Sequence, residues 1–397
     1  MQALLVLNAG SSSLKFGLFT DTPEPEPLAA GQIERIGAAP RLVLRGADGT
    51  DLTREDLAPD TAADHGGALT AALAATGQHF AGLRIAAVGH RIVHGGQEFA
   101  NPVGLTPDIL SALERLEPLA PLHQPHNLAG VRAAVAAFPQ ARQVGCFDTA
   151  FHRGQPFESD AYALPRSYYD RGIRRYGFHG LSYDYITGWL ARNAPELHDG
   201  RVVVAHLGAG ASTCAIMGGR AVGSSMGFSP LDGLAMGTRP GQLDPGVLLW
   251  LLDHEGLDSA ALTDLLYRRS GLLGLSGLSA DMRVLLDSDA PEAAQAIGYF
   301  CQRIRRSIAE LAAVMQGIDA VVFTAGIGEN SAPIRAEVCA GLAWLGLALD
   351  ARANAADAPA ADGPDGARRI STGASLVRAL VIPTNEEIVI ARATARL

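Results

Sequence analysis

Residues 3–19 of the chain read ALLVLNAGSSSLKFGLF. Leu4–Leu7 is an apolar run of strand length, and a second extended pattern resumes at Leu14–Phe19 around Lys15. The small polar residues between them, including Ser11–Ser13, are typical of a tight turn. The pattern predicts a β-hairpin whose turn presents backbone N–H groups, hydroxyls and an ammonium group, which suits a phosphate. An ordinary polar hairpin explains the same residues, so this stretch alone leaves both possibilities open.

A second stretch repeats this pattern later in the chain. Val202–Met217 reads VVVAHLGAGASTCAIM, an apolar run, a Gly/Ala/Ser turn and another apolar run. The sequence contains no Walker motif, and Gly208–Gly210 leads into a strand-like run rather than a helix, unlike a dinucleotide fingerprint. Two such hairpins, each opening one half of the chain, favour duplicated domains that bind ATP in the manner of actin and sugar kinases.

Composition narrows the classes of function. The chain has 397 residues, 48% hydrophobic and 18% charged, which is typical of a folded protein with room for two domains. Its net charge of −9 argues against nucleic acid or an anionic membrane as the main partner, although local arginines can still bind an anionic substrate. No apolar run approaches the roughly 20 residues of a membrane span, and the chain opens without a basic or cleavable segment.

The four cysteines indicate a reducing compartment. They are widely spaced, lie in apolar surroundings and show no metal-ligand spacing: Cys146, Cys214, Cys301 and Cys339. We therefore expect reduced core thiols in a cytoplasmic protein.

Two arginines are candidate anion clamps. Arg91 lies in HRIVHGG, residues 90–96, between two histidines and directly after the expected strand 85–88. Strand ends of this kind present ligand-binding side chains in α/β proteins, so we expect Arg91 and its histidines to bind an anion, although a single arginine more often forms a surface ion pair. Arg239 is the only cation in the long irregular stretch Ser225–Gly241, which makes it the second candidate.

Two further residues are candidates for chemistry. Asp148 follows the expected strand Gln143–Phe147, where a carboxylate can hold Mg²⁺ or a reactive oxygen; a helix N-cap is the alternative. His179 lies in RRYGFHG, after two arginines and before an expected helix. A buried structural histidine is the usual meaning of one histidine, but this setting favours a role at a charged transition state.

The remaining pattern predicts the surrounding elements. Helices are expected at 64–76, at 128–138 with Asn127 as N-cap, and at 291–315. Strands are expected at 42–44, 320–324 and 379–383. Loops are expected at 21–30, 270–283, 325–330 and 351–369. The glycine loop 325–330 precedes a helix that Ser331 and Pro333 start, an arrangement suited to nucleotide phosphates or ribose. Glu386 and Glu387, after the last strand, are either surface acids or metal ligands.

Together these segments resemble the acetate kinase family, in the superfamily of acetate and sugar kinases, Hsp70 and actin. The similarity extends nearly end to end through ordered motifs: NAGSSSLK, HRIVHGG, APLHQPHN, FDTAFH, RRYGFHG, HLGAGAS, MGFSPLDGLAMGTR, SGLLGLSGLSADMR, FTAGIGENS and PTNEE. So many matches in one order are highly specific.

The resemblance implies a fold and an activity. The fold would be α/β, with two duplicated actin-like (ribonuclease H-like) domains, residues 1–149 joined by 384–397 and residues 150–383, and a nucleotide cleft between them. The activity would be reversible in-line transfer of the ATP γ-phosphoryl group to acetate, giving acetyl phosphate and ADP. Family resemblance further implies a homodimer that uses Mg²⁺, for which Mn²⁺ can substitute.

The resemblance also assigns roles at matching positions. The Mg²⁺ ligands would be Asn8 and Glu386. The catalytic groups would be the carboxylate Asp148, the clamps Arg91 and Arg239, the transition-state residue His179, and His123 nearby. The groups that hold ATP would be Lys15, Ser11, Ser12, Ser13, His206, Leu207, Gly208, Ala209, Gly210, Asp281, Met282, Arg283, Gly326, Ile327, Gly328, Glu329 and Asn330. The acetate pocket would be lined by Arg91, Val93, Leu122, Phe178 and Pro230.

The chain departs from the family pattern in two motifs. The family's second phosphate loop usually reads HLGNGAS, whereas Ala209 stands here, which removes one donor to ATP. The usual HGTSH reads HGLSY here, residues 179–183, with its leading histidine kept. Because all the cations and acids are retained, we expect an active variant rather than a decayed enzyme.

Two alternatives remain open. A propionate- or butyrate-preferring kinase would share the mechanism, because one methylene shifts preference by only about 1–3 kcal/mol. A nucleotide-gated interaction protein, like actin or Hsp70, would bind partners with ATP but form no acyl phosphate. The set Arg91, His179 and Arg239 argues against the latter, because a simple ATPase has no use for a second anion site.

Overall fold

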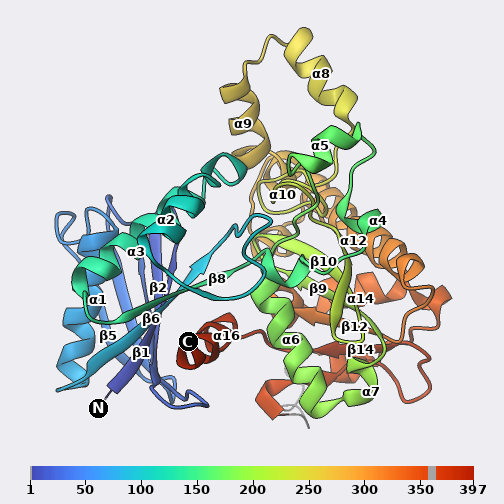
Figure 1. The fold of residues 1–397 in the computed structure, drawn as a ribbon. Helices are drawn as coiled ribbons and strands as arrows, with labels where there is room; N and C mark the ends of the chain where they lie inside the picture. The colour runs from blue at the N-terminus through green and yellow to red at the C-terminus, as the bar shows by residue number, and fades with distance from the viewer. Residues whose placement is uncertain (1, 356–363) are drawn as a thin grey trace. The chain divides into compact units, whose positions relative to one another are not determined.

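The computed structural model describes residues 2–355 and 364–397. The chain divides into two compact units, each with its own sheet and helices (Figure 1). Unit 1 consists of Met1–Ala150 and Asn385–Leu397, and unit 2 of Phe151–Thr384.

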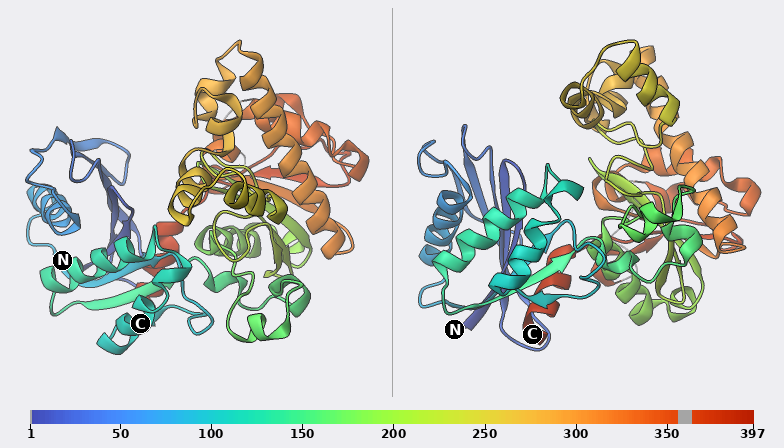
Figure 2. Two further views of the ribbon diagram at one scale, coloured as in Figure 1. Left: turned by 90° about the horizontal axis from the view of Figure 1, so that it is seen from above. Right: turned by 45° about the horizontal axis from the view of Figure 1, so that its top comes forward.

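Unit 1 is built on an eight-stranded sheet of order β5-β4-β3-β2-β1-β6-β8-β7. Its strands are β1 (Gln2–Ala9), β2 (Ser13–Thr20), β3 (Pro27–Glu34), β4 (Arg41–Gly46), β5 (Asp51–Asp56), β6 (Arg84–Ile92), β7 (Val103–Gly104) and β8 (Arg142–Phe147). Its helices are α1 (His65–His79), α2 (Pro107–Glu114), α3 (Gln124–Ala137) and α16 (Glu386–Arg396). Figures 1 and 2 show α1 and α3 on one face of this sheet and α16 on the other.

Unit 2 is built on a six-stranded sheet of order β11-β10-β9-β12-β14-β13. Its strands are β9 (Arg201–Leu207), β10 (Ala211–Met217), β11 (Arg220–Ser224), β12 (Ala320–Thr324), β13 (Arg368–Arg369) and β14 (Arg378–Val381). Its helices are α4 (Phe157–Asp160), α5 (Arg166–Asp170), α6 (Gly180–Asn193), α7 (Pro195–His198), α8 (Pro245–Asp253), α9 (Ser259–Arg268), α10 (Gly271–Ser276), α11 (Met282–Leu286), α12 (Pro291–Val314), α13 (Ala325–Asn330), α14 (Ala332–Ala340) and α15 (Ala351–Asn354).

The two sheets repeat one topology. In each, a hairpin (β1–β2 or β9–β10) is extended by a third antiparallel strand (β3 or β11). The first strand of each hairpin also pairs in parallel with β6 or β12, which in turn pair with β8 or β14. The repeat confirms the expected duplicated α/β fold and both glycine-rich hairpins.

Helices cover both faces of the unit 2 sheet. Successive residues of a strand point to opposite faces. In β10, Ser212 is hydrogen bonded to Tyr183 of α6, whereas its neighbour Thr213 is hydrogen bonded to Ser307 of α12. The helices α6 and α12 therefore pack on opposite faces, and the central strands between them are largely buried, including Val202, Val203, Val204 and Ala205 of β9.

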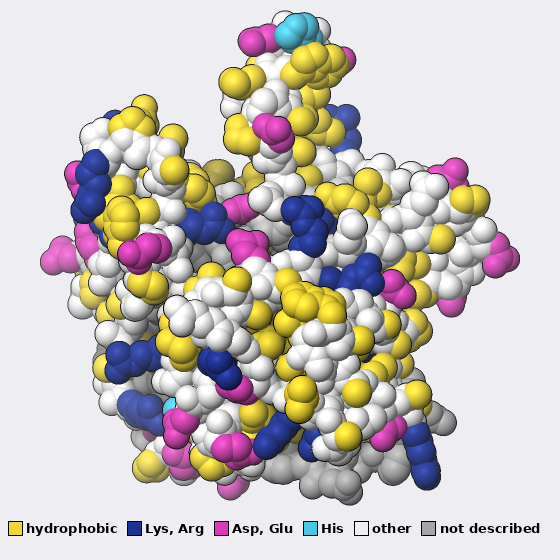
Figure 3. Space-filling view, turned by 90° about the vertical axis from the view of Figure 1, so that its right-hand side faces the viewer, with side chains coloured by type: hydrophobic (Ala, Val, Ile, Leu, Met, Phe, Trp, Pro, Cys, Tyr) yellow, Lys and Arg dark blue, Asp and Glu magenta, His cyan; other side chains and the backbone are white. Residues whose placement is uncertain are grey.

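Neither α8 nor α9 contains a buried residue. The exposed side chains of α8 are largely apolar: Val247, Leu249, Trp250 and Leu252. Figure 3 shows hydrophobic side chains gathered on this projecting segment. We call these four residues the α8 face.

Several expected elements are corrected by the structure. Asn127 does not cap a helix at 128–138, because α3 already begins at Gln124, with Pro125 in its first turn, where proline is favoured. The expected loop 21–30 ends at Pro27, where β3 begins, and the expected loop 270–283 contains α10 and the start of α11, which Asp281 caps.

The two remaining loops are also partly helical. Residues 325–330 form the short helix α13 rather than a glycine loop, and α14 follows. Within the expected loop 351–369, residues 351–354 form α15 and 368–369 form β13, while residues 356–363 lie outside the described residues. All four cysteines are buried, as expected. Across the described ranges, no helix is both long and apolar enough to cross a bilayer.

Candidate active site

Arg91 is the centre of a polar cluster in unit 1. Its side chain leaves β6, and its Nε and Nη2 donate to the two oxygens of Asp148 at 3.0 and 2.5 Å. Its Nη1 donates to Asn8 Oδ1 at 3.2 Å, and Glu386 Oε2 lies 3.7 Å from Nε. The structure thus brings together four residues that the sequence predicted as catalytic or metal-binding, from β1, β6, the end of β8 and the start of α16.

Burial and charge act in opposite directions in this cluster. Burial lowers the pKa of Arg91, but the charges of Asp148 and Glu386 outweigh it and raise the pKa above its ordinary value. Burial raises the pKa of the neighbouring Glu387, against the charge of Lys15 and together with that of Glu386. The Arg91 guanidinium is therefore a fixed cation held among oxygen acceptors.

The first hairpin turn lies beside this cluster. Lys15 is the direct ladder partner of Asn8 across β1 and β2. Ser11 and Ser12 are exposed, Ser13 is half-buried, and the backbone of Gly10 is fixed by its N–H to Ser13 O and by His65 Nε2 at 2.7 Å from Gly10 O. The turn thus presents two exposed hydroxyls and a lysine at the end of β1.

Asn127 braces the strand ends that carry this cluster. From inside α3, its Nδ2 donates to Ala9 O at 2.6 Å, and its Oδ1 accepts from Val93 N at 2.9 Å. Ala9 ends β1 and Val93 follows β6, so one buried amide joins the backbones that hold Asn8 and Arg91. This is a positioning role that the sequence did not predict.

The two histidines on either side of Arg91 pack in the core. His90 and His94 are buried; His90 Nε2 lies 2.8 Å from Gln143 Oε1, and His94 Nδ1 accepts from Gly96 N. The expectation that His90 binds an anion beside Arg91 is therefore wrong, because strand alternation points His90 away from Arg91. The same expectation for His94 stays a prediction. His123 is half-buried at the N-cap of α3, and Leu122 precedes it.

A second cluster, in unit 2, is centred on His179. His179 has a left-handed backbone, φ 57°, at the N-cap of α6, and its Nδ1 lies 2.8 Å from Ser212 Oγ. Its ring stacks on His206, with centroids 4.1 Å apart and planes at 18°. A strained backbone conformation held by surrounding contacts is typical of functional sites.

Arg239 and His179 converge on the second glycine turn. A Cβ built on Gly210 would lie 2.8 Å from Arg239 Nη2 and 3.4 Å from His179 Nε2, so both side chains reach the same space beside this glycine. Arg239 Nη1 donates to Pro230 O, and burial lowers its pKa. Unlike Arg91, Arg239 has no carboxylate partner in the part of the chain that the structure describes. A half-buried cation of this kind suits an anionic ligand.

The turn itself is held by backbone bonds. Gly208 N donates to Gly210 O, and Ala209 O accepts from Gly237 N, while the side chain of Ala209 is exposed. His206 and Leu207, at the end of β9, are buried.

Helix α13 is fixed by two residues. Glu329 Oε1 accepts from Ala325 N at 2.7 Å and from Thr384 N at 3.0 Å, so its carboxylate secures the helix. The fully buried Arg335 donates to the carbonyls of Gly328 and Glu329, and its Nε to Asn354 Oδ1. Sequence reasoning missed Arg335, whose neutral partners give no charge pattern to detect.

The other predicted residues of unit 2 lie in two settings. Asp281 and Arg283 form an exposed ion pair at 2.6 Å, and the hydrogen bonds from Arg283 lower the pKa of Asp281 to about 2. Phe178 is buried, and its carbonyl is bonded by His152 Nε2, while the carbonyl of Pro230 is held by Arg239.

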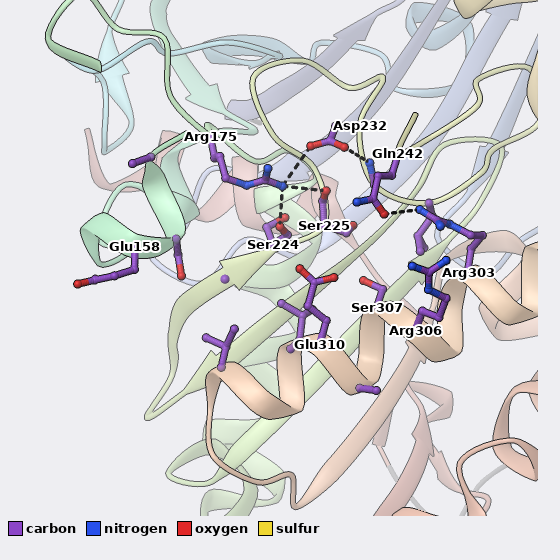
Figure 4. Close-up of a pocket in the computed structure, with 18 residues that line it drawn as sticks. Glu158, Arg175, Ser224, Ser225, Asp232, Gln242, Arg303, Arg306, Ser307 and Glu310 are labelled. Atoms are coloured by element: carbon purple, nitrogen blue, oxygen red, sulfur yellow. Dashed lines mark hydrogen bonds and ion pairs between the residues drawn. The ribbon is translucent and has the colours of Figure 1, made fainter. Parts of the chain in front are cut away.

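Unit 2 also contains a cavity of about 570 Å³ between α12, β11 and the segment after it. Arg303, Arg306 and Glu310 of α12 line it, and Arg175 forms an ion pair with Asp232 at 3.1 Å on its opposite side (Figure 4). None of the site residues predicted from the sequence lines this cavity.

Comparison with known proteins identifies the family. The profile of the acetokinase family matches residues 3–392. The chain belongs to this family. Among its relatives, the acetate kinase of Methylocella silvestris is 50% identical over 100% of this chain and 98% of that protein.

Two solved structures share the fold. The Porphyromonas gingivalis acetate kinase is 38% identical, covers 99% of both chains and superposes with a TM-score of 0.86. A propionate kinase from Francisella tularensis is 34% identical, covers 100% of both chains and has a TM-score of 0.89.

Proposed function

We propose that this chain catalyses reversible transfer of the γ-phosphoryl group of ATP to acetate, giving acetyl phosphate and ADP. Full-length similarity at 50% identity to an acetate kinase supports this activity. The observation that carries the mechanism is the convergence of Arg239 and His179 on Gly210, where a half-buried cation has no carboxylate partner among the described residues.

The proposed chemistry needs no general base, because acetate is ionised at neutral pH. What the protein must overcome is the repulsion between a carboxylate and a triphosphate. Arg91 and Arg239 would neutralise the carboxylate and the equatorial oxygens of a loose transition state, and His179 would donate to the transferring group. The bidentate bond from Arg91 leaves Asp148 as an orienting group rather than a proton acceptor.

The donor set in unit 1 fits Mg²⁺. Mg²⁺ prefers oxygen ligands and is usually bound by one or two carboxylates together with substrate phosphates. Asn8 Oδ1, Asp148 and Glu386 present oxygens around one guanidinium, and we propose that Asn8 and Glu386 hold the ion, with Asp148 orienting it. When bound, the ion would neutralise phosphate charge; Mn²⁺ has the same ligand preference. Among the described residues, no three His, Cys, Asp or Glu side chains form a metal cage, which this mode of binding does not need.

Each unit presents groups that suit a nucleotide ligand. In unit 1 the exposed turn Ser11–Ser13 and Lys15 would contact phosphates; in unit 2 the turn Gly208–Gly210 and helix α13 would contact the nucleotide, with Asp281–Arg283 beside it. For Glu329, the contribution would come from its backbone, because its carboxylate is already bonded to Ala325 N and Thr384 N.

Acetate is the proposed acceptor, and propionate is the alternative. Both acetate and propionate kinases are among the similar structures. Val93, Leu122, Phe178 and Pro230 would define the depth of the methyl pocket, and one methylene is worth only about 1–3 kcal/mol of discrimination.

We further propose a cytoplasmic homodimer, without nucleic acid or membrane as partner. The α8 face exposes 61% of Leu249 and 49% of Trp250, an apolar surface that a second copy of the chain would cover. The buried thiols and the net charge of −9 agree with the compartment and with the absence of polyanionic partners.

The deciding experiment is a hydroxamate trap for acyl phosphate, with Mg-ATP and acetate, propionate or butyrate in parallel. The highest kcat/KM with acetate supports the proposal. A higher value with a longer acid keeps the mechanism and changes the substrate. ATP binding without acyl phosphate from any of the acids would instead support a nucleotide-gated interaction protein.

A further inference from the structure

Tyr183, Ser212 and His179 form a continuous hydrogen-bonded chain in unit 2. Tyr183 Oη lies 2.5 Å from Ser212 Oγ, which lies 2.8 Å from His179 Nδ1. Tyr183 and Ser212 are fully buried, and the Tyr183 ring is held edge-on against His152 at 5.6 Å between centroids. Tyr183 stands where the family usually has a histidine, so this chain of groups belongs to the present sequence rather than to the general pattern.

The hydrogen bonds of His206, which stacks on His179, place a proton on its Nδ1. His206 Nδ1 lies 2.9 Å from Ser182 Oγ, and the Ser182 hydroxyl donates to Thr384 Oγ1. Because a hydroxyl has only one proton, His206 donates its Nδ1–H to Ser182. Two imidazolium rings stacked at 4.1 Å would repel each other, so the pair favours neutral rings.

We propose that Tyr183, acting through Ser212, is a positioning residue that holds His179 in the neutral tautomer with its proton on Nε2. In this arrangement the Tyr183 hydroxyl donates to Ser212 Oγ, and the Ser212 hydroxyl donates to His179 Nδ1. The remaining ring proton must then lie on Nε2.

This tautomer matters because of where Nε2 lies. Nε2 is the ring atom nearest to the space above Gly210 that Arg239 Nη2 also approaches. An N–H there donates to an anionic phosphoryl oxygen, whereas a bare nitrogen lone pair would repel it. The identity of the anion rests on the proposed function, whereas the tautomer of His179 is inferred from the hydrogen bonds alone.

Removal of the Tyr183 hydroxyl allows the hydrogen bond between Ser212 and His179 to reverse its direction. In Tyr183→Phe, Ser212 Oγ loses its hydrogen-bond donor. It can then accept a hydrogen bond from His179 Nδ1–H, in the tautomer whose Nε2 carries no proton. The ring of phenylalanine keeps the packing against His152. We therefore expect kcat to fall about tenfold, less than the loss of a whole transition-state donor, with KM for ATP and acetate within twofold.

The experiment combines kinetics with ¹⁵N NMR of histidine-labelled protein, in which the His179 signals are assigned by their absence in His179→Gln. Wild type should show a protonated Nε2 and an unprotonated Nδ1, and Tyr183→Phe should show exchange between tautomers. The matched control is Tyr176→Phe. It removes another buried hydroxyl, which is bonded to Gly172 O and takes no part in the hydrogen bonds between Tyr183, Ser212 and His179. The Tyr183→Phe effect should vanish in a Ser212→Ala background.

Each outcome is decisive. A wild-type His179 with its proton on Nδ1, or a Tyr183→Phe variant with unchanged kcat, overturns the inference. Equal losses of kcat in Tyr183→Phe and Tyr176→Phe also overturn it, because they would reflect general destabilisation. If wild type forms no acyl phosphate, the proposed function fails, while the NMR result still decides the tautomer.

Discussion

Both carboxylate oxygens of Asp148 accept hydrogen bonds from one guanidinium, that of Arg91, at 3.0 and 2.5 Å. Asp148 is 1% exposed, whereas Arg91 also contacts Asn8 and lies near Glu386. The ion pair therefore has two consequences. Its loss would leave a charge without its partner, and its presence fixes the position of Arg91 at the end of a parallel strand.

Asp148→Asn tests both consequences. We expect a loss of about 3 kcal/mol in the free energy of unfolding, the lower end for breaking a buried ion pair, because Arg91 keeps Glu386 and Asn8. Turnover should fall as well, because the guanidinium loses its bidentate hold. Urea unfolding followed by circular dichroism gives the first quantity. The control is Asp170→Asn, which removes an exposed ion pair with Arg166 and should cost less than about 1 kcal/mol. Equal effects of the two variants would contradict the assignment.

Arg239→Ala should separate catalysis from stability. Arg239 is bonded only to the Pro230 carbonyl and has no carboxylate partner among the described residues, so its removal leaves no buried charge behind. We expect kcat to fall on the order of a thousandfold, by analogy with arginine fingers, while the unfolding midpoint stays unchanged. Acyl phosphate formation at saturating substrates measures the effect, and the exposed Arg306→Ala serves as control. Retention of turnover within tenfold would remove Arg239 from the mechanism.

The local parts of the fold could be predicted from sequence, because they depend on neighbouring residues. Both glycine hairpins, α12 and the positions of Arg91, Asp148 and His179 at the ends of elements follow from apolar periodicity and turn residues. The expected roles of these residues came from the family resemblance.

The side chains that fix the backbone around the site could not be predicted, because their hydrogen-bond partners are distant in sequence or electrically neutral. Asn127 resembles a helix cap in sequence, yet its side chain bonds to Ala9 and Val93, which lie 118 and 34 residues away. Arg335 is bonded to carbonyls and to Asn354 rather than to an acid. The glycines at 326 and 328 predict a loop, but these residues form α13. The carboxylate of Glu329, near the end of this helix, accepts a hydrogen bond from Ala325 N at its start.

Acid should destabilise the protein through two buried histidines. Burial lowers the pKa of His90 and of His152 to about 4, from an ordinary value of 6.5. Both rings are thus neutral in the native state but take up a proton on unfolding below about pH 6.5. Stability is therefore full above pH 6.5 and is lost as pH falls toward 4, by about 1.4 kcal/mol per pH unit for each histidine. Urea unfolding at pH 7, 6 and 5 measures the slope. The slope of the unfolding free energy with pH should be shallower in His90→Gln and unchanged in a variant of the exposed His254. A wild-type free energy that does not change with pH would contradict the burial of these rings as neutral groups.

The α8 face should control the oligomeric state. We expect the double variant Leu249→Glu/Trp250→Glu to shift a wild-type dimer to monomer, because charges placed in an apolar interface must be desolvated on association. Sedimentation velocity at micromolar concentration distinguishes the two states. Trp344→Glu, which changes an apolar side chain that is 71% exposed elsewhere in unit 2, should leave the dimer intact. A monomeric wild type, or a double variant that stays dimeric, would show that a second copy does not cover this face.

Ala209→Asn tests the departure in the second glycine turn. The backbone of Ala209 is fixed through its carbonyl to Gly237 N, and its side chain is exposed, so an amide can be added there without disturbing the fold. One additional hydrogen bond to ATP contributes about 1 kcal/mol, so KM for ATP should fall roughly fivefold, while kcat and KM for acetate stay unchanged. Ala209→Leu, which adds similar volume without a donor, provides the control and should not lower KM. If both variants lower KM equally, the gain comes from contact area. If neither does, ATP does not approach this turn closely enough to accept from residue 209, and the assignment of the turn to the nucleotide must be withdrawn.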